Sequence, residues 1–309
     1  MIYNDFGKTG LSVSALGFGA APIGLLKTEQ DKVASIVNTL LDMGVNLIDT
    51  AAGYAGSEEA LGNAVGHRRD EYILVSKCGR KSDDLPGEDW SPEVITATVD
   101  RALRRLKTNH LDVMLLHSCG LDVLQKGEAL EALVKARDAG KIRFAGYSGD
   151  NETVAYSAAL PDIAVIETSI NLVDQANIEG LLPLTREYGI GVIAKRPVAN
   201  AAWKSLDDQP GFYRDYAKTY HDRFKMMGLK LESLGLGEEV TDWAQVALRY
   251  TLSQEGVHTA IIGTTNPDNA QSNIEAANQG PLPKEALQKI NDAFKEGQGL
   301  ADETWKAQT

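Results

Sequence analysis

The feature that most constrains this chain is a short apolar run that recurs along its length, ends in a polar residue and precedes a stretch with helical spacing. The runs occupy residues 15–19, 44–49, 72–77, 111–117, 142–148, 163–167, 190–195 and 259–263. Near-continuous runs of Val, Ile and Leu of this length are typical of strands buried on both faces of a parallel sheet. Their alternation with helices predicts a series of βαβ units.

The segments between the runs carry helix signals of several kinds. Residues 31–43 place apolar side chains at helical spacing. Ser91 and Pro92 are suited to the N-cap and first turn of a helix that reaches about Leu106. Further helices are expected at 129–139, which stops before a glycine, at 243–252 and at 283–294.

Eight strand-helix units predict an α/β fold of the closed (β/α)8 TIM barrel type. Alternation alone leaves an open, doubly wound sheet as the rival. The length of 309 residues suits one barrel of about 250 residues with insertions, so we expect residues 1–309 to form a single domain. Residues 2–13 hold a Gly-Lys-Thr-Gly turn between short extended pieces, which predicts an N-terminal hairpin that caps the barrel bottom.

A long segment, residues 197–239, follows the seventh predicted strand and exceeds an ordinary βα connection. Two interpretations stay open for it: a lid or substrate wall at the carboxyl end of the barrel, or an insertion that packs its own aromatic side chains. Its aromatic residues are Trp203, Phe212, Tyr213, Tyr216, Tyr220 and Phe224.

Composition disfavours nucleic acids and membranes as partners. A net charge of −12 disfavours nucleic acid and anionic membranes, because both are bound through Lys and Arg. Two cysteines, Cys78 and Cys119, make no disulfide framework, and no apolar run approaches the ~20 residues that span a bilayer. The first ten residues lack the apolar core of a signal peptide, so we expect a soluble, cytoplasmic protein.

Barrel enzymes carry their chemistry at the carboxyl ends of the strands, so the polar residues that end the runs are the candidate site. Ionisable groups there would be costly to bury without partners. The polar residues that end the runs are Asp49, Lys77, His117, Ser148, Glu167 and Lys195.

The second to fourth strand ends suggest acid–base chemistry. Asp49 and Lys77 can form an ion pair, and Tyr54 lies on the loop that follows Asp49. A nearby ammonium favours a phenolate, so we expect the pKa of Tyr54 to fall and the tyrosine to act as a general acid or base. His117 can share the same substrate oxygen. Each residue also has an alternative without catalysis. The Asp49–Lys77 pair can be purely structural, His117 can be a hydrogen-bonded polar residue, and Tyr54 can be an ordinary loop tyrosine.

The last predicted strand leads into a second candidate site. Asn266 suits an N-cap and Pro267 the first helical position, so free N–H groups there can bind an anion, although an ordinary capped helix is equally compatible. The chain has no dinucleotide Gly-x-Gly-x-x-Gly after a strand, no Walker loop and no His-Glu-x-x-His, so no metal site is expected.

With these residues in place, the chain resembles the aldo-keto reductase superfamily nearly end to end. The resemblance rests on Gly17-Phe18-Gly19, on Asp49-Thr50-Ala51 leading to Tyr54, on Val75-Ser76-Lys77 and on Leu115-Leu116-His117. Within the family, residues 76–80 are similar to plant galactose-dehydrogenase-like and bacterial sugar-dehydrogenase-like members.

The resemblance implies an oxidoreductase that uses a nicotinamide cofactor. Tyr54 would exchange a proton with the substrate oxygen, Lys77 held by Asp49 would tune the tyrosine, and His117 would position the oxygen. Ser148 would hold the carboxamide. The cofactor-binding set implied is Gly19, Ser148, Glu167, Lys195, Arg196, Gly263, Thr264, Asn269 and Asn273.

Some positions depart from the family pattern. Gly149 stands where Asn is usual, Glu167 where Gln is common, and Lys195 where an aromatic or small residue often lies. Family habit favours NADP(H), yet residues 263–273 hold no Lys or Arg for a 2′-phosphate, which leaves NAD(H) possible.

The expected substrate is a small carbonyl compound or a sugar, and the sequence leaves its identity and the oligomeric state open. Two other functions stay in view. One is a non-catalytic, cofactor-binding regulatory subunit, like the potassium-channel β subunits that share this fold. The other is a lyase in which Lys77 forms a Schiff base with its substrate.

Overall fold

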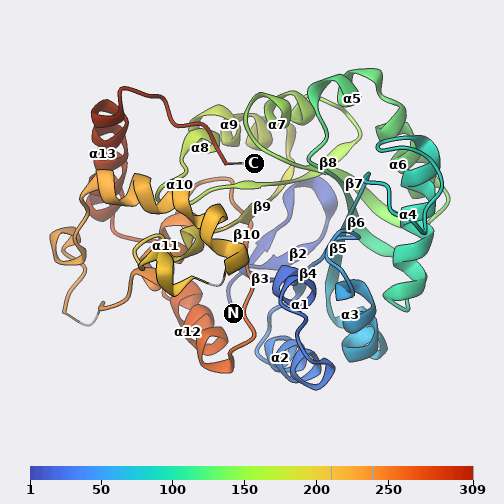
Figure 1. The fold of residues 1–309 in the computed structure, drawn as a ribbon, viewed down its shortest axis with the longest axis horizontal. Helices are drawn as coiled ribbons and strands as arrows, with labels where there is room; N and C mark the ends of the chain where they lie inside the picture. The colour runs from blue at the N-terminus through green and yellow to red at the C-terminus, as the bar shows by residue number, and fades with distance from the viewer. Residues whose placement is uncertain (210, 239, 309) are drawn as a thin grey trace.

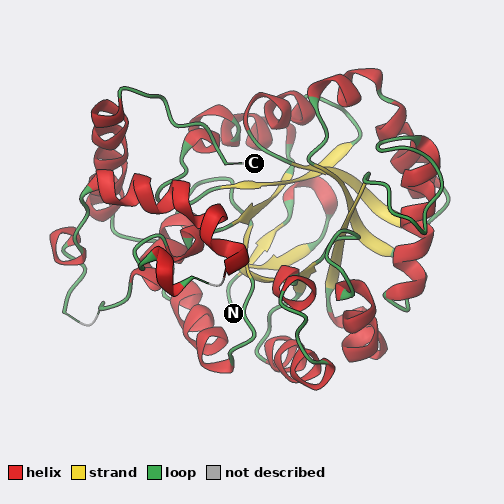
Figure 2. Ribbon diagram, in the orientation of Figure 1, coloured by secondary structure: helices red, strands yellow, loops and turns green. Residues whose placement is uncertain are grey.

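The computed structural model describes the whole chain except residues 210, 239 and 309, and its centre is a closed barrel of eight parallel strands (Figures 1 and 2). The barrel closes because the last strand pairs with the first, which rules out the open-sheet alternative. The strands are β3 (Leu16–Gly19), β4 (Leu47–Asp49), β5 (Ile73–Cys78), β6 (Leu111–His117), β7 (Ile142–Ser148), β8 (Ile163–Ser169), β9 (Gly191–Lys195) and β10 (Thr259–Ile262).

Helices surround this barrel (Figure 2), and their start signals behave as the sequence predicts. The Ser91 hydroxyl accepts a hydrogen bond from the Val94 amide at 3.3 Å, and the Asn266 side chain accepts one from the Asp268 amide at 2.8 Å. The helices are α1 (Ala21–Leu25), α2 (Gln30–Asp42), α3 (Ser57–Val65), α4 (Pro92–Arg105), α5 (Leu121–Lys126), α6 (Glu128–Asp138), α7 (Asn151–Ala158), α8 (Ala176–Gly180), α9 (Leu182–Tyr188), α10 (Gly211–Met227), α11 (Trp243–Leu252), α12 (Pro267–Asn278) and α13 (Lys284–Ala301). The 3₁₀ turns are Gly7–Thr9, Gly66–Glu71, Ala199–Ala201, Leu206–Asp208 and Leu231–Leu234.

The barrel strands bury both faces, which explains their continuous apolar runs. Along β6, Val113 and Leu115 pack in the barrel interior, while Met114 and Leu116 belong to the layer between the sheet and the helices. This two-sided burial places most polar residues of the strands near the strand ends, where they can take part in chemistry.

The N-terminal segment forms the predicted hairpin and closes the barrel bottom. Strands β1 (Tyr3–Asp5) and β2 (Ser12–Ser14) pair antiparallel, and Phe6 and Val13 are fully buried among the side chains of the barrel interior. At Gly7 the backbone has a φ of +57°, and a Cβ there would lie 2.5 Å from the Gly189 carbonyl oxygen. Only glycine fits this contact between hairpin and barrel.

The long segment 197–239 contains α10, and its described aromatic side chains mainly pack with each other. Tyr220 is fully buried. The rings of Trp203 and Phe224 lie 6.3 Å apart, and both contact Trp243 of α11. These contacts favour the packing interpretation for this part of the segment. The side chains of Phe212, Tyr213 and Tyr216 lie outside the described residues.

The segment that follows α13 runs back towards the barrel (Figure 1), and no sequence signal predicted it. Trp305 is buried against Phe294, with ring centroids 5.1 Å apart. The Ala307 backbone exchanges hydrogen bonds with the Asn151 side chain, and the Gln308 amide donates to Asp174 at 3.0 Å. Residues 302–308, which we call the tail, therefore form part of the carboxyl rim of the barrel.

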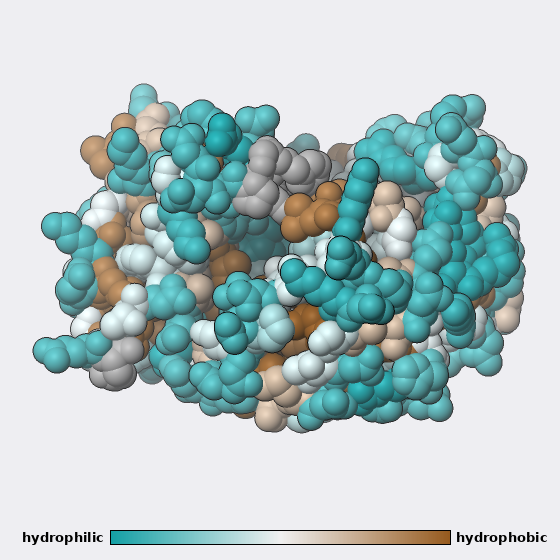
Figure 3. Space-filling model, turned by 60° about the horizontal axis from the view of Figure 1, so that its bottom comes forward, coloured by the Kyte–Doolittle hydropathy of each residue, from teal (hydrophilic) through white to brown (hydrophobic). Residues whose placement is uncertain are grey.

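The outer surface is largely hydrophilic. On the face shown in Figure 3, hydrophobic residues appear in separate patches among hydrophilic ones. Leu300, Tyr3 and Leu26 are among the few large hydrophobic side chains with substantial exposure. In the part of the chain that the structure describes, no helix combines the length and apolar character needed to cross a bilayer.

Candidate active site

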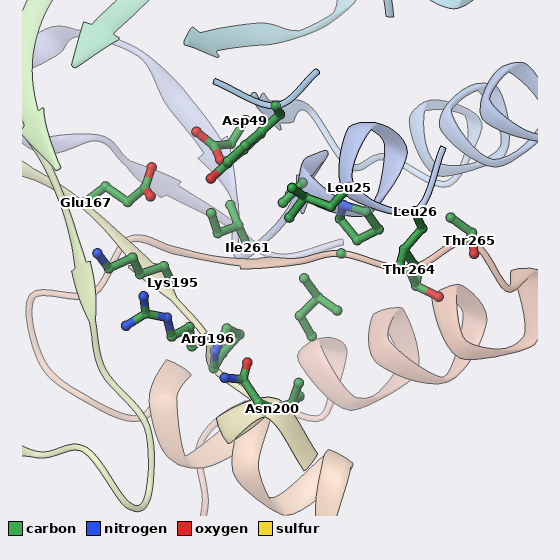
Figure 4. A pocket seen from close by; sticks show the side chains of 18 of the residues that line it. Leu25, Leu26, Asp49, Glu167, Lys195, Arg196, Asn200, Ile261, Thr264 and Thr265 are labelled. Atoms are coloured by element: carbon green, nitrogen blue, oxygen red, sulfur yellow. The ribbon is translucent and has the colours of Figure 1, made fainter. Parts of the chain in front are cut away.

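A cavity of about 740 Å³ opens at the carboxyl ends of the barrel strands (Figure 4). It collects most of the residues that the sequence predicted for the site from their positions at strand ends and in the following loops. Those that line it are Gly19, Asp49, Tyr54, His117, Ser148, Glu167, Lys195, Arg196, Gly263, Thr264 and Asn269. Two predicted residues, Lys77 and Asn273, are not among the described residues that line the cavity.

Lys77 lies beneath the cavity floor, at the centre of a buried charge cluster. Its ammonium lies 2.6 Å from both carboxylate oxygens of Asp49, 3.0 Å from the Thr50 carbonyl oxygen and 3.2 Å from Glu167 Oε2. The Lys77 side chain has no exposed surface, and those of Asp49 and Glu167 are almost fully buried. Strands β4, β5 and β8 thus bring three charged groups together inside the protein.

The three groups shift one another's proton affinity. Burial acts to lower the pKa of Lys77, but the charges of Asp49 and Glu167 outweigh burial and raise that pKa above its ordinary value. Burial and the Glu167 charge raise the pKa of Asp49. Burial opposes ionisation of Glu167 as well, yet Lys77 and Lys195 hold its pKa below the ordinary value. Lys77 is therefore a permanently charged ammonium at neutral pH.

Tyr54 and His117 stand above this cluster and face the cavity. Their rings meet edge to face with centroids 6.0 Å apart, and the Lys77 ammonium lies 5.2 Å from the Tyr54 ring centre. Helix α1 fixes the Tyr54 loop, because a Cβ at Gly24 would lie 2.7 Å from the Tyr54 carbonyl carbon. A small polar group that enters the cavity can contact both rings.

The expected fall in the pKa of Tyr54 is wrong for this structure. Burial of the hydroxyl end raises the pKa of Tyr54 to about 12, and the charge of Lys77 offsets only part of that rise. Asp49 and Glu167 add to the rise because they oppose a phenolate. The sequence argument counted the ammonium and missed the desolvation and the two carboxyl groups.

His117 is neutral at physiological pH. Burial lowers its pKa to about 3, and the charge of Lys77 acts in the same direction. A neutral imidazole can donate one hydrogen bond from a ring nitrogen without adding a charge to the site.

A second group of polar residues lies at the ends of β7, β8 and β9. The Ser148 hydroxyl donates to Glu167 at 3.3 Å, and the Lys195 ammonium pairs with Asp150 at 3.0 Å. Arg196 donates to the Ser169 hydroxyl at 2.8 Å and to the Gln308 carbonyl oxygen. Sequence reasoning missed Asp150, although its position two residues beyond the end of β7 was a usable signal.

The loop after β9, at the start of the segment 197–239, supplies a further wall of the cavity, which is one of the two interpretations that the sequence left open for this segment. Arg196, Ala199, Asn200 and Ala201 all have positive φ angles, a costly conformation for residues other than glycine. Asn200 lines the cavity, and its Nδ2 is buried with no hydrogen-bond partner among the described residues. The Gln209 side chain donates to the Asn200 carbonyl oxygen at 3.0 Å. Strain and an unused donor make this loop a candidate binding element.

The start of α12 forms the far end of the cavity, across from Glu167 and Lys195 (Figure 4). Gly263 is required there, because a Cβ would lie 2.7 Å from the Pro22 ring and 2.9 Å from the Gly19 carbonyl oxygen. Asn269 lines the cavity, whereas Asn273, one turn further along α12, does not. A helix N-terminus together with Lys195 and Arg196 suits a ligand that carries negative charge.

Comparison with known proteins agrees with this geometry. The family model for the aldo/keto reductase family matches residues 15–295. An uncharacterised oxidoreductase, YqkF of Bacillus subtilis (strain 168), is 30% identical and covers 94% of this chain and 95% of its own. The L-galactose dehydrogenase of Arabidopsis thaliana is 29% identical over 88% of this chain and 87% of its own.

A solved structure shares the architecture. The aldo-keto reductase AKR11C1 from Bacillus halodurans, in its holo form, aligns with a TM-score of 0.79 and 29% identity, covering 95% of this chain and 96% of its own. A closed barrel with an N-terminal hairpin and an Asp49, Tyr54, Lys77 and His117 group at its carboxyl rim is thus accompanied by similarity along almost the whole sequence. The chain belongs to the aldo/keto reductase family.

Proposed function

We propose that residues 1–309 act as one barrel domain that transfers hydride between a nicotinamide cofactor and an aldehyde, ketone or sugar alcohol, with Tyr54 as general acid and base. The observation that carries this proposal is the arrangement of Tyr54 and His117 at the cavity wall above the buried Lys77–Asp49 pair. Oxidoreductase chemistry on carbonyl or sugar substrates is what the family as a whole performs.

Tyr54, Lys77 and His117 have different roles in the proposed proton transfer. When bound, the reduced nicotinamide supplies the hydride. Tyr54 donates its hydroxyl proton to the carbonyl oxygen during reduction and takes a proton back during alcohol oxidation. Lys77 stabilises the resulting phenolate by its charge, and Asp49 keeps the ammonium in place. Neutral His117 donates a hydrogen bond to the same oxygen and fixes its position.

The cavity residues fit a nicotinamide dinucleotide. Ser148 and Glu167 are suited to the carboxamide, and the unused Asn200 amide, Lys195 and Arg196 are suited to the pyrophosphate. The adenosine end would lie at the start of α12, with Gly19 beside Gly263 and Asn273 one turn beyond the cavity lining. The residues proposed for that end are Gly263, Thr264, Asn269 and Asn273.

The choice between the two nicotinamide cofactors rests on the same end of the cavity. Family habit favours NADP(H), and the Thr264 hydroxyl with the backbone N–H groups of α12 can receive a phosphate. No Lys or Arg occurs between residues 263 and 273, so NAD(H) remains a possible cofactor.

The other two functions find less support. Lys77 is fully buried, is held by two carboxyl groups and keeps its proton, which disfavours attack on a substrate carbonyl to form a Schiff base. A purely regulatory subunit would bind cofactor without turnover. Tyr54 and His117 both line one cavity, which favours an enzyme.

The test combines nucleotide titration with turnover. Fluorescence titration with NADPH and with NADH should show tight binding of one or both, and a panel of aldehydes, ketones and aldoses should contain substrates. Tyr54→Phe should reduce turnover about 10²- to 10⁴-fold and leave cofactor affinity unchanged. Tyr188→Phe, at a tyrosine that is 45% exposed, is the matched control.

Each failure has its own meaning. Absence of nucleotide binding would overturn the proposal. Binding without turnover of any substrate would favour the regulatory subunit. Full turnover by Tyr54→Phe would overturn the assignment of the acid.

A further inference from the structure

Glu167 is a second carboxyl group on the single ammonium of Lys77. The Lys77 ammonium contacts Asp49 at 2.6 Å through both oxygens and Glu167 Oε2 at 3.2 Å. Because both carboxyl groups contact the same nitrogen atom, they also lie close to each other. One positive charge therefore faces two groups that would each be negative in water.

Burial makes two charged carboxylates at this spacing unfavourable. Asp49 is 1% exposed and Glu167 is 2% exposed, so water cannot screen their repulsion. Two carboxyl groups buried side by side on one ammonium are expected to hold one proton between them, because two like charges this close in a buried site are too unfavourable to form together. With one proton, the cluster of Asp49, Glu167 and Lys77 has no net charge.

The other charged groups that face Glu167 do not replace this proton. Lys195 of β9 favours the ionised form of Glu167, but its ammonium pairs with Asp150 at 3.0 Å and is therefore shared with a second carboxylate. His117 of β6 also faces Glu167 but stays neutral down to about pH 3. From β7, the Ser148 hydroxyl donates to Glu167 Oε1 and adds no charge.

We propose that Asp49 and Glu167 share one proton beside Lys77, and that Glu167 is thereby a positioning residue that sets the proton affinity of Tyr54. This inference rests on the proposed function for its kinetic consequence, but the shared proton itself is a property of the protein alone. Glu167 acts through Lys77 and Asp49, whereas Tyr54 exchanges the proton with substrate.

The consequence for Tyr54 follows from the charge. Once the shared proton leaves at high pH, the pair carries an additional negative charge that opposes the Tyr54 phenolate. Glu167→Gln keeps the shape of the side chain, offers an amide N–H to Asp49 and removes that charge. The pKa of Tyr54 should therefore be lower in Glu167→Gln than in the wild type.

The first experiment measures protonation directly in the protein without cofactor or substrate. Carbon-13 NMR of the carboxyl carbons, assigned through their bonds to the backbone, should show one proton on the Asp49–Glu167 pair at pH 7. The two resonances should move together when that proton leaves. Two fully ionised carboxylates throughout pH 6 to 9 would overturn the proposal.

The second experiment measures the pH profile of kcat/KM for carbonyl reduction. Reduction requires the Tyr54 proton, so the rate falls as the pH rises through the pKa of Tyr54. This basic limb should lie about one pH unit lower in Glu167→Gln. An unmoved limb, with the variant folded by circular dichroism, would overturn the role of Glu167. Glu167→Asp, which withdraws the carboxyl group from Lys77, should move the limb in the same direction.

Glu58→Gln is the matched control. Glu58 is as buried as Glu167 and accepts a hydrogen bond from Ser76 at 2.9 Å, so its substitution tests the general effect of losing a buried carboxylate. Its basic limb should coincide with that of the wild type. If the wild type reduces no carbonyl compound, the proposed function fails, and the NMR experiment still decides whether the proton is shared.

Discussion

The two sides of the barrel rim are built in different ways. On the β4–β5 side, Asp49 and Lys77 project from adjacent, fully buried strands and hold each other at 2.6 Å. On the β8–β9 side, Arg196 sits on a strained loop and contacts Ser169 and the tail. The Asp49–Lys77 pair comes from neighbouring strands and gains one contact from Glu167 of β8, whereas the Arg196 contacts depend on a segment more than a hundred residues further along the chain.

The positions of the side chains are fixed in a different way on each side of the rim. The β4–β5 side obtains its geometry from sheet register, which fixes where successive strand ends lie. The β8–β9 side obtains its geometry from tertiary contacts, since Asp174, Ser169 and Arg196 all interact with Gln308. The proposed proton chemistry uses the first side, whereas the β8–β9 side resembles the loop-built binding regions of other folds.

The largest effect is expected on the β4–β5 side, from Lys77→Met. Removing the ammonium leaves Asp49 and Glu167 buried without a cation, which should lower the free energy of unfolding by about 3–5 kcal/mol at neutral pH and abolish turnover. The two carboxyl groups then have folded-state pKa values raised above the unfolded ones. Their contribution to stability is present at low pH and lost as the pH rises, so the deficit should be smaller at pH 5 than at pH 8.

Urea unfolding at both pH values measures this deficit. Lys135→Met, at a lysine that is 73% exposed and paired with Glu131 one turn away, should be nearly neutral. A deficit that does not depend on pH would indicate lost packing and weaken the contrast between the two sides.

A smaller effect is expected on the β8–β9 side, from Trp305→Ala. Loss of the buried indole, which packs on Phe294 and lies 5.2 Å from the Arg223 guanidinium, should cost about 3–4 kcal/mol of stability. Release of the tail should also weaken nucleotide binding through Arg196. Thermal unfolding and nucleotide titration measure the two effects.

Turnover at saturating cofactor and substrate separates the two sides in this variant. It should stay close to wild type, because Tyr54 and Lys77 do not touch the tail. A large loss of turnover under these conditions would mean that the tail supports the reacting groups as well, and the comparison would fail.

The smallest effect is expected from Asp174→Asn, which tests the anchor of the tail. Burial raises the pKa of Asp174 to about 6, although the Gln308 amide and the Tyr220 hydroxyl donate hydrogen bonds to it. A raised carboxyl pKa contributes stability that is present below about pH 4 and lost as the pH rises through about 6. Wild type should therefore lose up to about 3 kcal/mol relative to Asp174→Asn between pH 4 and pH 7.

Chemical unfolding of both proteins across this pH range is the measurement. Parallel curves for the two proteins would show that Asp174 does not titrate in this interval. Asp138→Asn, at an aspartate that is 65% exposed, controls for the loss of a surface charge.

The β4–β5 side could be predicted from the sequence because buried parallel strands have a local pattern. Continuous apolar runs predicted all eight strands, and their polar ends predicted Asp49, Lys77 and His117 as neighbours. Glu167 was predicted as a site residue from the same pattern. Its contact with Lys77 was not, since pairing across the barrel interior depends on side-chain reach.

The β8–β9 side could be predicted only in part. Lys195 and Arg196 follow a strand, but nothing local indicates that residues 302–308 would contact that rim. The predicted fall in the pKa of Tyr54 was wrong for a related reason. Desolvation depends on everything that surrounds a group in the folded chain. Local sequence patterns predict which residues meet at the rim, and the full fold decides their electrostatic environment.

The hairpin at the barrel bottom has a consequence for the timing of events at the opposite end. With Phe6 and Val13 filling the floor, whatever enters the cavity must leave by the same mouth. Ser148 and Glu167 lie deep and almost fully buried, whereas Tyr54 and His117 are only half-buried. A molecule that reaches the deep pair has to arrive before one that stops at the tyrosine, and to depart after it. If the cofactor occupies the deep pair, as proposed, the closed floor imposes an ordered mechanism in which the cofactor binds first and is released last.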